Sequence, residues 1–325
     1  MPHSILSGSL VASRFGFIIV IGEIAGGNRM KHDATNRRTR LRKITLALFI
    51  GLFAASCAKR VDSTTDPHET IDYDLALAGC CEGAEPLPRE ISAFFEGSAS
   101  TVVHTTRAIK LRQGYLQNNI AAQDRIYETL EPLDLIFISI KSLLSGQIAG
   151  YYLNHTAIYL GTETQLRAID MWDDPSVRPY HDQIRAGQTV IEANGVDVRL
   201  VDQSTLFEID AIALFRPPHM TATRQHEIVA TLFDTVGTPF DYHFDVSDAD
   251  SIYCAELLYV AMPELQWPVR EIYGRPSLLP DEMAAEALRG RNGLHFLGYI
   301  YGTPHEWGVG SRAMLGQVIA RHWPT

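Results

Sequence analysis

The 325-residue chain contains few cysteines and no recognisable metal-binding pattern. Four cysteines are present, and none of the twelve histidines belongs to an HExxH sequence or to a Cys/His cluster with zinc-finger spacing. The net charge is −10, and no stripe rich in Lys and Arg occurs beyond residue 60. These absences predict a protein that uses no metal or other cofactor and does not bind nucleic acid.

The N-terminal region also lacks an apolar run of membrane-spanning length. The run from Ile44 to Ala55 is too short to cross the roughly 30 Å of hydrocarbon in a bilayer, which disfavours a transmembrane anchor. Basic residues precede this run from Met30 onward, and small residues followed by Cys57 end it, a pattern typical of a bacterial export signal with a lipobox. We therefore expect residues 1–57 to be an export signal. Lipidation of Cys57 would anchor the protein in the cell envelope, at the outer membrane and facing the periplasm.

A second apolar stretch, from Phe15 to Ala25, precedes Met30. Two export signals in series would serve no purpose. Our hypothesis is that translation starts at Met30 and that residues 1–29 are not part of the native protein. Detection of residues 1–29 in the native precursor by intact-mass analysis would contradict it.

Composition divides the remainder of the chain into two parts. Residues 58–86 are polar and acidic without a hydrophobic period, which predicts a flexible tether. Cys80 and Cys81 lie in this segment, and adjacent Cα atoms are only about 3.8 Å apart. We therefore expect two linker thiols or an intermolecular pair. Residues 87–325 have the composition of one folded domain.

Hydrophobic periodicity predicts helices at the start of this domain and a sheet in its middle. Apolar residues at helical spacing indicate one broken helix or two helices between 87 and 130. The predicted strands are Leu135–Ile140, Thr156–Leu160, Leu166–Met171, Gln188–Glu192, Ile209–Arg216 and His295–Tyr301, the last followed by a Gly-rich tail. Further helices are predicted over Thr221–Val236, capped by Thr221 or Thr223, and from Cys254 to Met262. This order indicates an α+β fold.

Cys254 lies at the predicted start of an apolar helix. The unpaired N–H groups and the positive dipole end of a helix N-terminus favour thiolate over thiol. His155 lies upstream, in a predicted strand, and an imidazole titrates near neutral pH. A thiolate near an imidazole can attack a carbonyl carbon, so the pair indicates a cysteine amidase. Taken alone, each residue is also consistent with ordinary core packing.

Five short segments carry a family resemblance by their order along the chain. They are Pro132–Phe137, Asn154–Gly161, Val190–Val196, Gly237–Asp241 and Tyr253–Leu257. In this order they resemble the circularly permuted, NlpC-like branch of the papain-like cysteine hydrolases, in particular the lipoprotein amidases of YiiX/YaeF type. The resemblance covers roughly residues 130–290 and implies a permuted papain-like domain, with a central antiparallel sheet or barrel and flanking helices.

Two positions depart from the family pattern. Leu133 replaces the small residue that usually precedes the Asp, and Asn154 replaces the usual Ser before the His. Both are neighbours of the expected site, so neither removes a reacting group.

The resemblance also implies a catalytic triad. Cys254 is the nucleophile, His155 the general base, and Glu192 the group that orients His155. A triad is recognised by geometry and role, so a His that precedes the Cys in the chain is compatible with this chemistry. Asp197 is the alternative orienting residue, because Glu192 could instead cap the turn at Asn194.

Further site residues are expected around the nucleophile. Tyr253 and the backbone N–H of Cys254 are the expected oxyanion donors. Asp241 belongs either to a substrate subsite or to a capping interaction, and the sequence does not separate the two.

These observations predict a hydrolase that cleaves an amide or peptide bond through a thioester intermediate. A cell-wall peptide is the favoured substrate, because an envelope enzyme of this type encounters it. One alternative is a lipid-directed acyltransferase or esterase of the same fold, which would need an apolar entrance near the helix of Cys254. The other is a catalytically inactive envelope-binding lipoprotein, which the intact triad disfavours.

Overall fold

The computed structural model describes Leu77, residues 79–82, Ala84, residues 97–202, Ser204 and residues 207–323. The expected export signal, its lipidation site Cys57 and the start at Met30 lie outside the described residues. In the part of the chain that the structure describes, no helix combines the length and the apolar character needed to cross a membrane.

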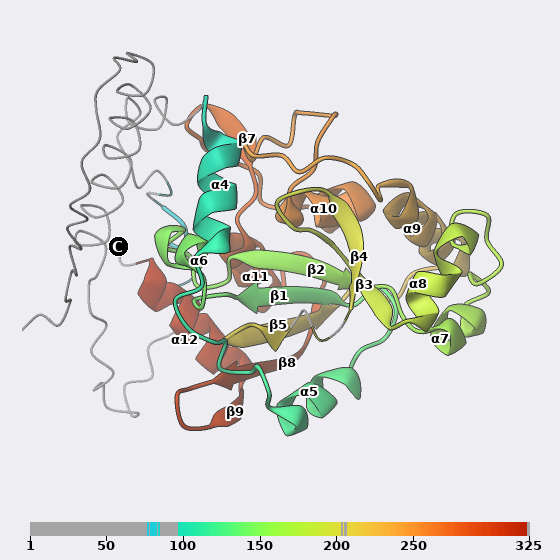
Figure 1. Cartoon of the computed structure of the whole chain (residues 1–325), viewed down its shortest axis with the longest axis horizontal. Coiled ribbons are helices and arrows are strands. Elements are labelled where there is room, and N and C mark those ends of the chain that lie inside the picture. The colour runs from blue at the N-terminus through green and yellow to red at the C-terminus, as the bar shows by residue number, and fades with distance from the viewer. Residues whose placement is uncertain are drawn as a thin grey trace, which may run out of the picture. The chain divides into compact units, whose positions relative to one another are not determined.

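Within the described residues, seven strands form one antiparallel sheet in the order β4-β3-β2-β1-β5-β8-β9 (Figure 1). The strands are β1 (Leu135–Ser139), β2 (His155–Tyr159), β3 (Gln188–Ala193), β4 (Val198–Asp202), β5 (Ala211–Arg216), β8 (His295–Gly302) and β9 (Trp307–Gly310). The sheet is open, with β4 and β9 at its edges, so the barrel alternative is wrong and the antiparallel sheet is confirmed. A separate hairpin joins β6 (Arg270–Ile272) to β7 (Arg275–Ser277).

Helices cover both faces of this sheet. They are α4 (Ala99–Ala108), α5 (Ile120–Tyr127), α6 (Leu144–Ile148), α7 (Glu163–Ala168), α8 (His181–Arg185), α9 (Ala222–Asp234), α10 (Cys254–Ala261), α11 (Pro280–Leu288) and α12 (Arg312–His322). Figure 1 shows α10 and α5 on opposite sides of the strands. The arrangement is the α+β layering that the sequence predicts.

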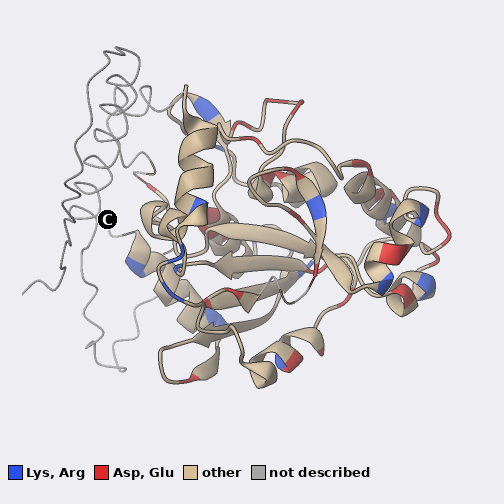
Figure 2. Ribbon diagram, viewed as in Figure 1, with Lys and Arg blue, Asp and Glu red and all other residues tan. Residues whose placement is uncertain are grey.

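The central strand β1 shows why the sequence produces these layers. Leu135 and Phe137 belong to a core cluster shared with α9 to α12, whereas Ile136 and Ile138 belong to a second cluster shared with α5. Because both faces of β1 are buried, its sequence is an uninterrupted apolar run rather than an alternating one. Figure 2 accordingly shows few charged residues on the middle strands.

Two stretches differ from their predicted structure. The first half of the predicted strand at 166–171 falls on helix α7, because Thr162 and Gln165 form a capping box that starts a helix at Glu163. The predicted Gly-rich tail contains β9 and α12, the latter started by the Ser311 hydroxyl, which accepts from the N–H of Met314 at 3.1 Å. Strand β4 and helix α11 were not predicted, whereas β1, β2, β3, β5, β8, α9 and α10 match their predicted ranges within about two residues.

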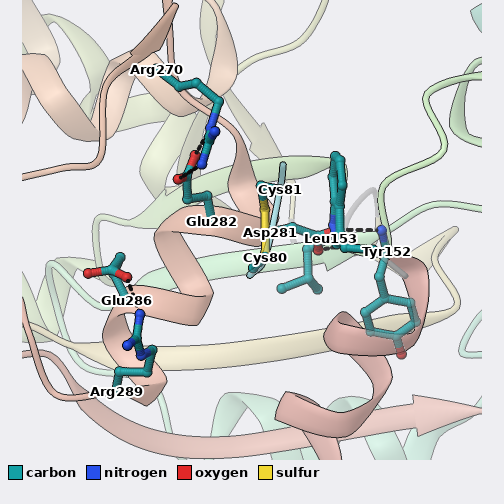
Figure 3. Close-up of a disulfide and its surroundings, with 10 residues drawn as sticks. Cys80, Cys81, Tyr152, Leu153, Arg270, Asp281, Glu282, Glu286 and Arg289 are labelled. Carbon is teal, nitrogen blue, oxygen red and sulfur yellow. Dashed lines mark hydrogen bonds and ion pairs between the residues drawn. A yellow bond between two sulfur atoms is a disulfide. The ribbon is translucent and has the colours of Figure 1, made fainter. Parts of the chain in front are cut away.

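The expectation for Cys80 and Cys81 is wrong. The two cysteines are bonded to each other, and Figure 3 shows the disulfide beside Leu153 and Asp281. Both cysteines are buried in the larger core cluster with Leu77 and Leu153. Leu77, Cys80 and Cys81 therefore pack on the domain, although the composition of residues 58–86 is polar overall. The remainder of the predicted tether lies outside the described residues.

Candidate active site

Cys254 is the first residue of helix α10, which packs on strands β2 and β3. The buried residues Ala255, Leu257 and Leu258 fix the helix against the sheet. At the helix start, the carboxyl of Glu256 accepts a hydrogen bond from the N–H of Tyr253 at 3.2 Å. These contacts fix the thiol of Cys254 at a helix N-terminus, where backbone N–H groups have no partner within the helix.

His155 and Glu192 face each other from adjacent strands. His155 begins β2, Glu192 lies on β3, and His155 Nε2 is 2.7 Å from Glu192 Oε2. Both side chains are buried, as is Cys254. A carboxylate can only accept, so Nε2 carries the hydrogen of this bond and Nδ1 is the ring nitrogen left to interact with the thiol.

The three groups shift one another's protonation. Burial would lower the pKa of His155, but the negative charge of Glu192 and hydrogen bonds to Cys254 and Glu192 raise that pKa to about 9. Burial would likewise raise the pKa of the Cys254 thiol, but the hydrogen bond and charge of His155 bring that pKa below its ordinary value. Compared with the isolated groups, this arrangement favours a thiolate–imidazolium pair.

Glu192 remains ionised in the same surroundings. Burial would raise the pKa of its carboxyl, but the charge of His155 and a hydrogen bond from His155 lower it, with further contributions from the charge of Arg107 and a hydrogen bond from Asn194. The carboxylate therefore supplies the negative charge that keeps the imidazole protonated.

The other predicted site residues lie elsewhere. Asp197 accepts a hydrogen bond from Arg199 Nε at 2.5 Å, so the structure brings Glu192 rather than Asp197 to His155. The Tyr253 hydroxyl accepts a hydrogen bond from the backbone N–H of Leu278 at 2.6 Å in the core.

Asp241 has a capping role. Its two carboxylate oxygens accept hydrogen bonds from the N–H groups of His243 and Asp245, each at 2.6 Å. The carboxyl therefore holds the loop that leads to α10, and of the two predicted alternatives the structure supports capping.

Sequence reasoning missed two groups beside the triad. The backbone N–H of Thr156 helps to lower the pKa of the Cys254 thiol. Arg107 on α4 adds a positive charge that acts in the same direction on Cys254 and on Glu192. A backbone donor has no side chain to mark it in the sequence. Arg107 is one of several cations in a segment predicted only to be helical, and nothing in the sequence distinguishes it from the others.

Comparison with known families agrees with this geometry. The model of the permuted papain-like amidase enzymes of YaeF/YiiX type, the C92 family, matches residues 129–306. The chain belongs to this family. No curated protein and no solved structure gives a significant match.

Membership in the C92 family confirms the resemblance drawn from the five segments. The matched region contains all of them, together with Cys254, His155 and Glu192. The family consists of amidases, so it supports cysteine amidase activity as the general class of this chain. Helices α4, α5 and α12 and strand β9 lie outside the matched region.

Proposed function

We propose that this C92-family chain hydrolyses an amide or peptide bond with Cys254 as the nucleophile, His155 as the general acid and base, and Glu192 as the residue that orients His155. The observation that carries the proposal is the 2.7 Å bond between His155 Nε2 and Glu192 Oε2, because it leaves the other ring nitrogen for the thiol of Cys254.

The first half of the reaction forms a thioester. The thiolate of Cys254 attacks the carbonyl carbon of the scissile amide, and the carbonyl oxygen becomes an oxyanion. The backbone N–H of Cys254 belongs to the first residue of α10, where the helix offers it no partner, and it is the donor proposed to stabilise that charge. The protonated His155 then gives a proton to the departing nitrogen, the C–N bond breaks, and a free amine leaves.

The second half regenerates the enzyme. Neutral His155 takes a proton from a water molecule, and the resulting hydroxide attacks the thioester carbon. The C–S bond breaks, a carboxylic acid is released, and the thiolate–imidazolium pair returns. Glu192 stays ionised throughout and stabilises the protonated imidazole in each half.

A peptide of the cell envelope is the proposed substrate, and the outer membrane, through a lipid on Cys57, is the proposed location. The support is the sequence between 30 and 57, with its basic start, short apolar run and terminal Cys57. Such an anchor would place the enzyme among cell-wall peptides.

The proposal is tested by incubating the full chain with peptides released from peptidoglycan, in water enriched in oxygen-18. Hydrolysis through Cys254 gives a product whose new carboxyl group carries one heavy oxygen atom, detected by mass spectrometry, and the Cys254→Ala variant gives no such product. Equal cleavage by Cys254→Ala would refute the assignment of the nucleophile. Transfer of the acyl group to another acceptor without heavy oxygen would favour the lipid-directed acyltransferase.

A further inference from the structure

Helix α4 is attached to the turn that follows Glu192, although α4 lies outside the region that defines the family. The Tyr242 hydroxyl donates a hydrogen bond to the carbonyl oxygen of Gly195 at 2.7 Å and accepts one from His104 Nε2 at 2.8 Å. His104 belongs to α4, and Gly195 lies in the turn between β3 and β4. These two bonds hold one face of α4 at the edge of the active site.

The Arg107 side chain rests directly on this turn. A Cβ atom placed on Gly195 would lie 3.0 Å from Arg107 Nε and 3.1 Å from Arg107 Cδ. Gly195 also has a φ of +93°, which side chains other than that of glycine disfavour. Because Gly195 has no side chain, the guanidinium group of Arg107 can occupy the space beside it. Gly195 lies three residues after Glu192 in the chain.

Arg107 forms no direct ion pair in the described part of the chain, although its charge acts on Glu192. By contrast, two arginines on strands of the sheet form ion pairs, Arg199 with Asp197 and Arg216 with Asp134. Helix α4 contributes no acidic residue of its own, and Arg107 is its only charged residue (Figure 2). A half-buried guanidinium with five donors and no ion pair is prepared to receive an anion.

The charge of Arg107 also reaches the reacting groups. Burial raises the pKa values of Cys254 and Glu192, and His155 lowers both; the positive charge of Arg107 adds to that lowering. An anion bound at the guanidinium would therefore lie within electrostatic range of the bond being cleaved.

We propose that Arg107 is a substrate-binding residue that recognises a carboxylate on the substrate, close to the scissile amide. This inference rests on the proposed function of Cys254. The planar guanidinium matches a carboxylate with two parallel hydrogen bonds. The guanidinium carries a single positive charge, which matches a monoanion and favours a carboxylate over a doubly charged phosphate. Substrates built from amino acids carry such a group either at the chain end or on an acidic side chain.

Two alkylating reagents of nearly equal size test the site without knowledge of the substrate. Iodoacetate carries a carboxylate and iodoacetamide a neutral amide; each forms a carbon–sulfur bond at Cys254 and releases iodide. The ratio of their rates cancels any change in the thiolate fraction, because both reagents react with the same thiolate. Rates are followed on the full chain by peptide mass spectrometry.

The rate ratio of iodoacetate to iodoacetamide is expected to fall about three- to ten-fold in Arg107→Gln. Arg107→Lys keeps the charge and should keep most of the ratio. Arg185→Gln removes one positive charge at an exposed site that pairs with Glu163, and it should leave the ratio unchanged. A ratio in Arg107→Gln equal to that of the unaltered chain would overturn the inference.

Three compounds with one skeleton distinguish the two sources of the carboxylate. N-acetylglutamine has only the terminal carboxylate, N-acetylglutamic acid α-amide only the side-chain carboxylate, and N-acetylglutaminamide neither. The compound whose carboxylate matches that of the substrate should slow alkylation by iodoacetamide more than the neutral N-acetylglutaminamide does. In Arg107→Gln the two compounds should slow alkylation equally. A difference that persists in Arg107→Gln would count against the inference.

The two proposals fail in different ways. If Cys254 reacts rapidly with iodoacetamide in a way that depends on His155, but the rate ratio is the same in Arg107→Gln, the carboxylate site is overturned and the proposed hydrolase is not. A Cys254 that reacts with neither reagent overturns both.

Discussion

The side-chain amide of Asn154 hydrogen-bonds both backbone groups of Ile140. Its Oδ1 accepts from the N–H of Ile140 and its Nδ2 donates to the carbonyl oxygen of Ile140, each at 3.0 Å. Ile140 directly follows β1 and Asn154 directly precedes His155. The amide therefore joins the end of one strand to the start of the next, beside the proposed general base.

Asn154→Ser restores the residue that is usual in the family and should destabilise this chain. A serine hydroxyl is too short to reach both groups of Ile140, so we expect a loss of about 1–3 kcal/mol in the free energy of unfolding. Urea denaturation measures the change. A variant as stable as the unaltered chain would show that the paired hydrogen bonds contribute nothing.

Leu133 adopts a backbone conformation that favours glycine, with a φ of +74°, while its side chain is buried. Leu133→Gly loses the buried side chain, whereas Leu133→Ala loses it and also keeps the strained φ. We expect Leu133→Gly to be the more stable of the two by about 1 kcal/mol. At the buried Leu160, which lacks a positive φ, the alanine variant should be the more stable. If the alanine variant is the more stable one at Leu133 as well as at Leu160, the backbone of Leu133 is not strained.

Glu192→Gln tests the orienting residue. A glutamine keeps the size of the side chain but removes the charge that raises the pKa of His155 to about 9, so the imidazolium becomes less stable. We expect kcat to fall about 10²-fold or more and the alkaline limb of the pH profile to move to lower pH. Asp197→Asn is the matched control, because Asp197 pairs with Arg199, and its pH profile should match that of the unaltered chain. A larger effect from Asp197→Asn than from Glu192→Gln would reverse the assignment.

Glu256 makes stability depend on pH. Burial, with smaller effects from Asp241 and neighbouring acids, raises the pKa of its carboxyl from 4.5 to about 8 in the folded chain. Between these values the folded chain binds more protons than the unfolded chain, so this group stabilises the fold at low pH and the effect is lost as pH rises toward 8. Glu256→Gln cannot ionise, yet its carbonyl can still accept from Tyr253 N–H.

Relative to the unaltered chain, Glu256→Gln should therefore gain roughly 3 kcal/mol in the free energy of unfolding between pH 5 and pH 8. Urea denaturation at the two pH values measures the difference. Asp182→Asn alters a fully exposed carboxyl and serves as the control. Parallel pH dependence in Glu256→Gln and the unaltered chain would rule out a raised pKa at Glu256.

The sequence predicted the parts of the fold whose local pattern agrees with their final environment. Strand β1 is an uninterrupted apolar run because both of its faces are buried, and α10 begins at Cys254 as expected. The strand predicted at 166–171 is wrong because the apolar residues of this stretch are compatible with either a strand or a helix. The capping box at Thr162 and Gln165 decides in favour of a helix.

The sequence likewise predicts only those parts of the candidate site that have a local pattern. Cys254 and His155 have local signals, a helix start and a strand, whereas the choice of Glu192 over Asp197 depends on strands β2 and β3 lying side by side. The contact of Arg107 with Gly195 joins residues 88 positions apart and leaves no periodic trace in the sequence. Such long-range contacts follow from tertiary packing, which local patterns do not encode.

The most direct test of the account follows the alkylation of Cys254 by iodoacetamide against pH, in the full chain and in His155→Ala, with each cysteine resolved by peptide mass spectrometry. Because the surroundings of Cys254 lower the pKa of its thiol, alkylation should become rapid at a lower pH than for a free cysteine, whose pKa is about 8.5. His155→Ala should lose this low-pH reactivity. A thiol that titrates like a free cysteine and is indifferent to His155 would contradict the account.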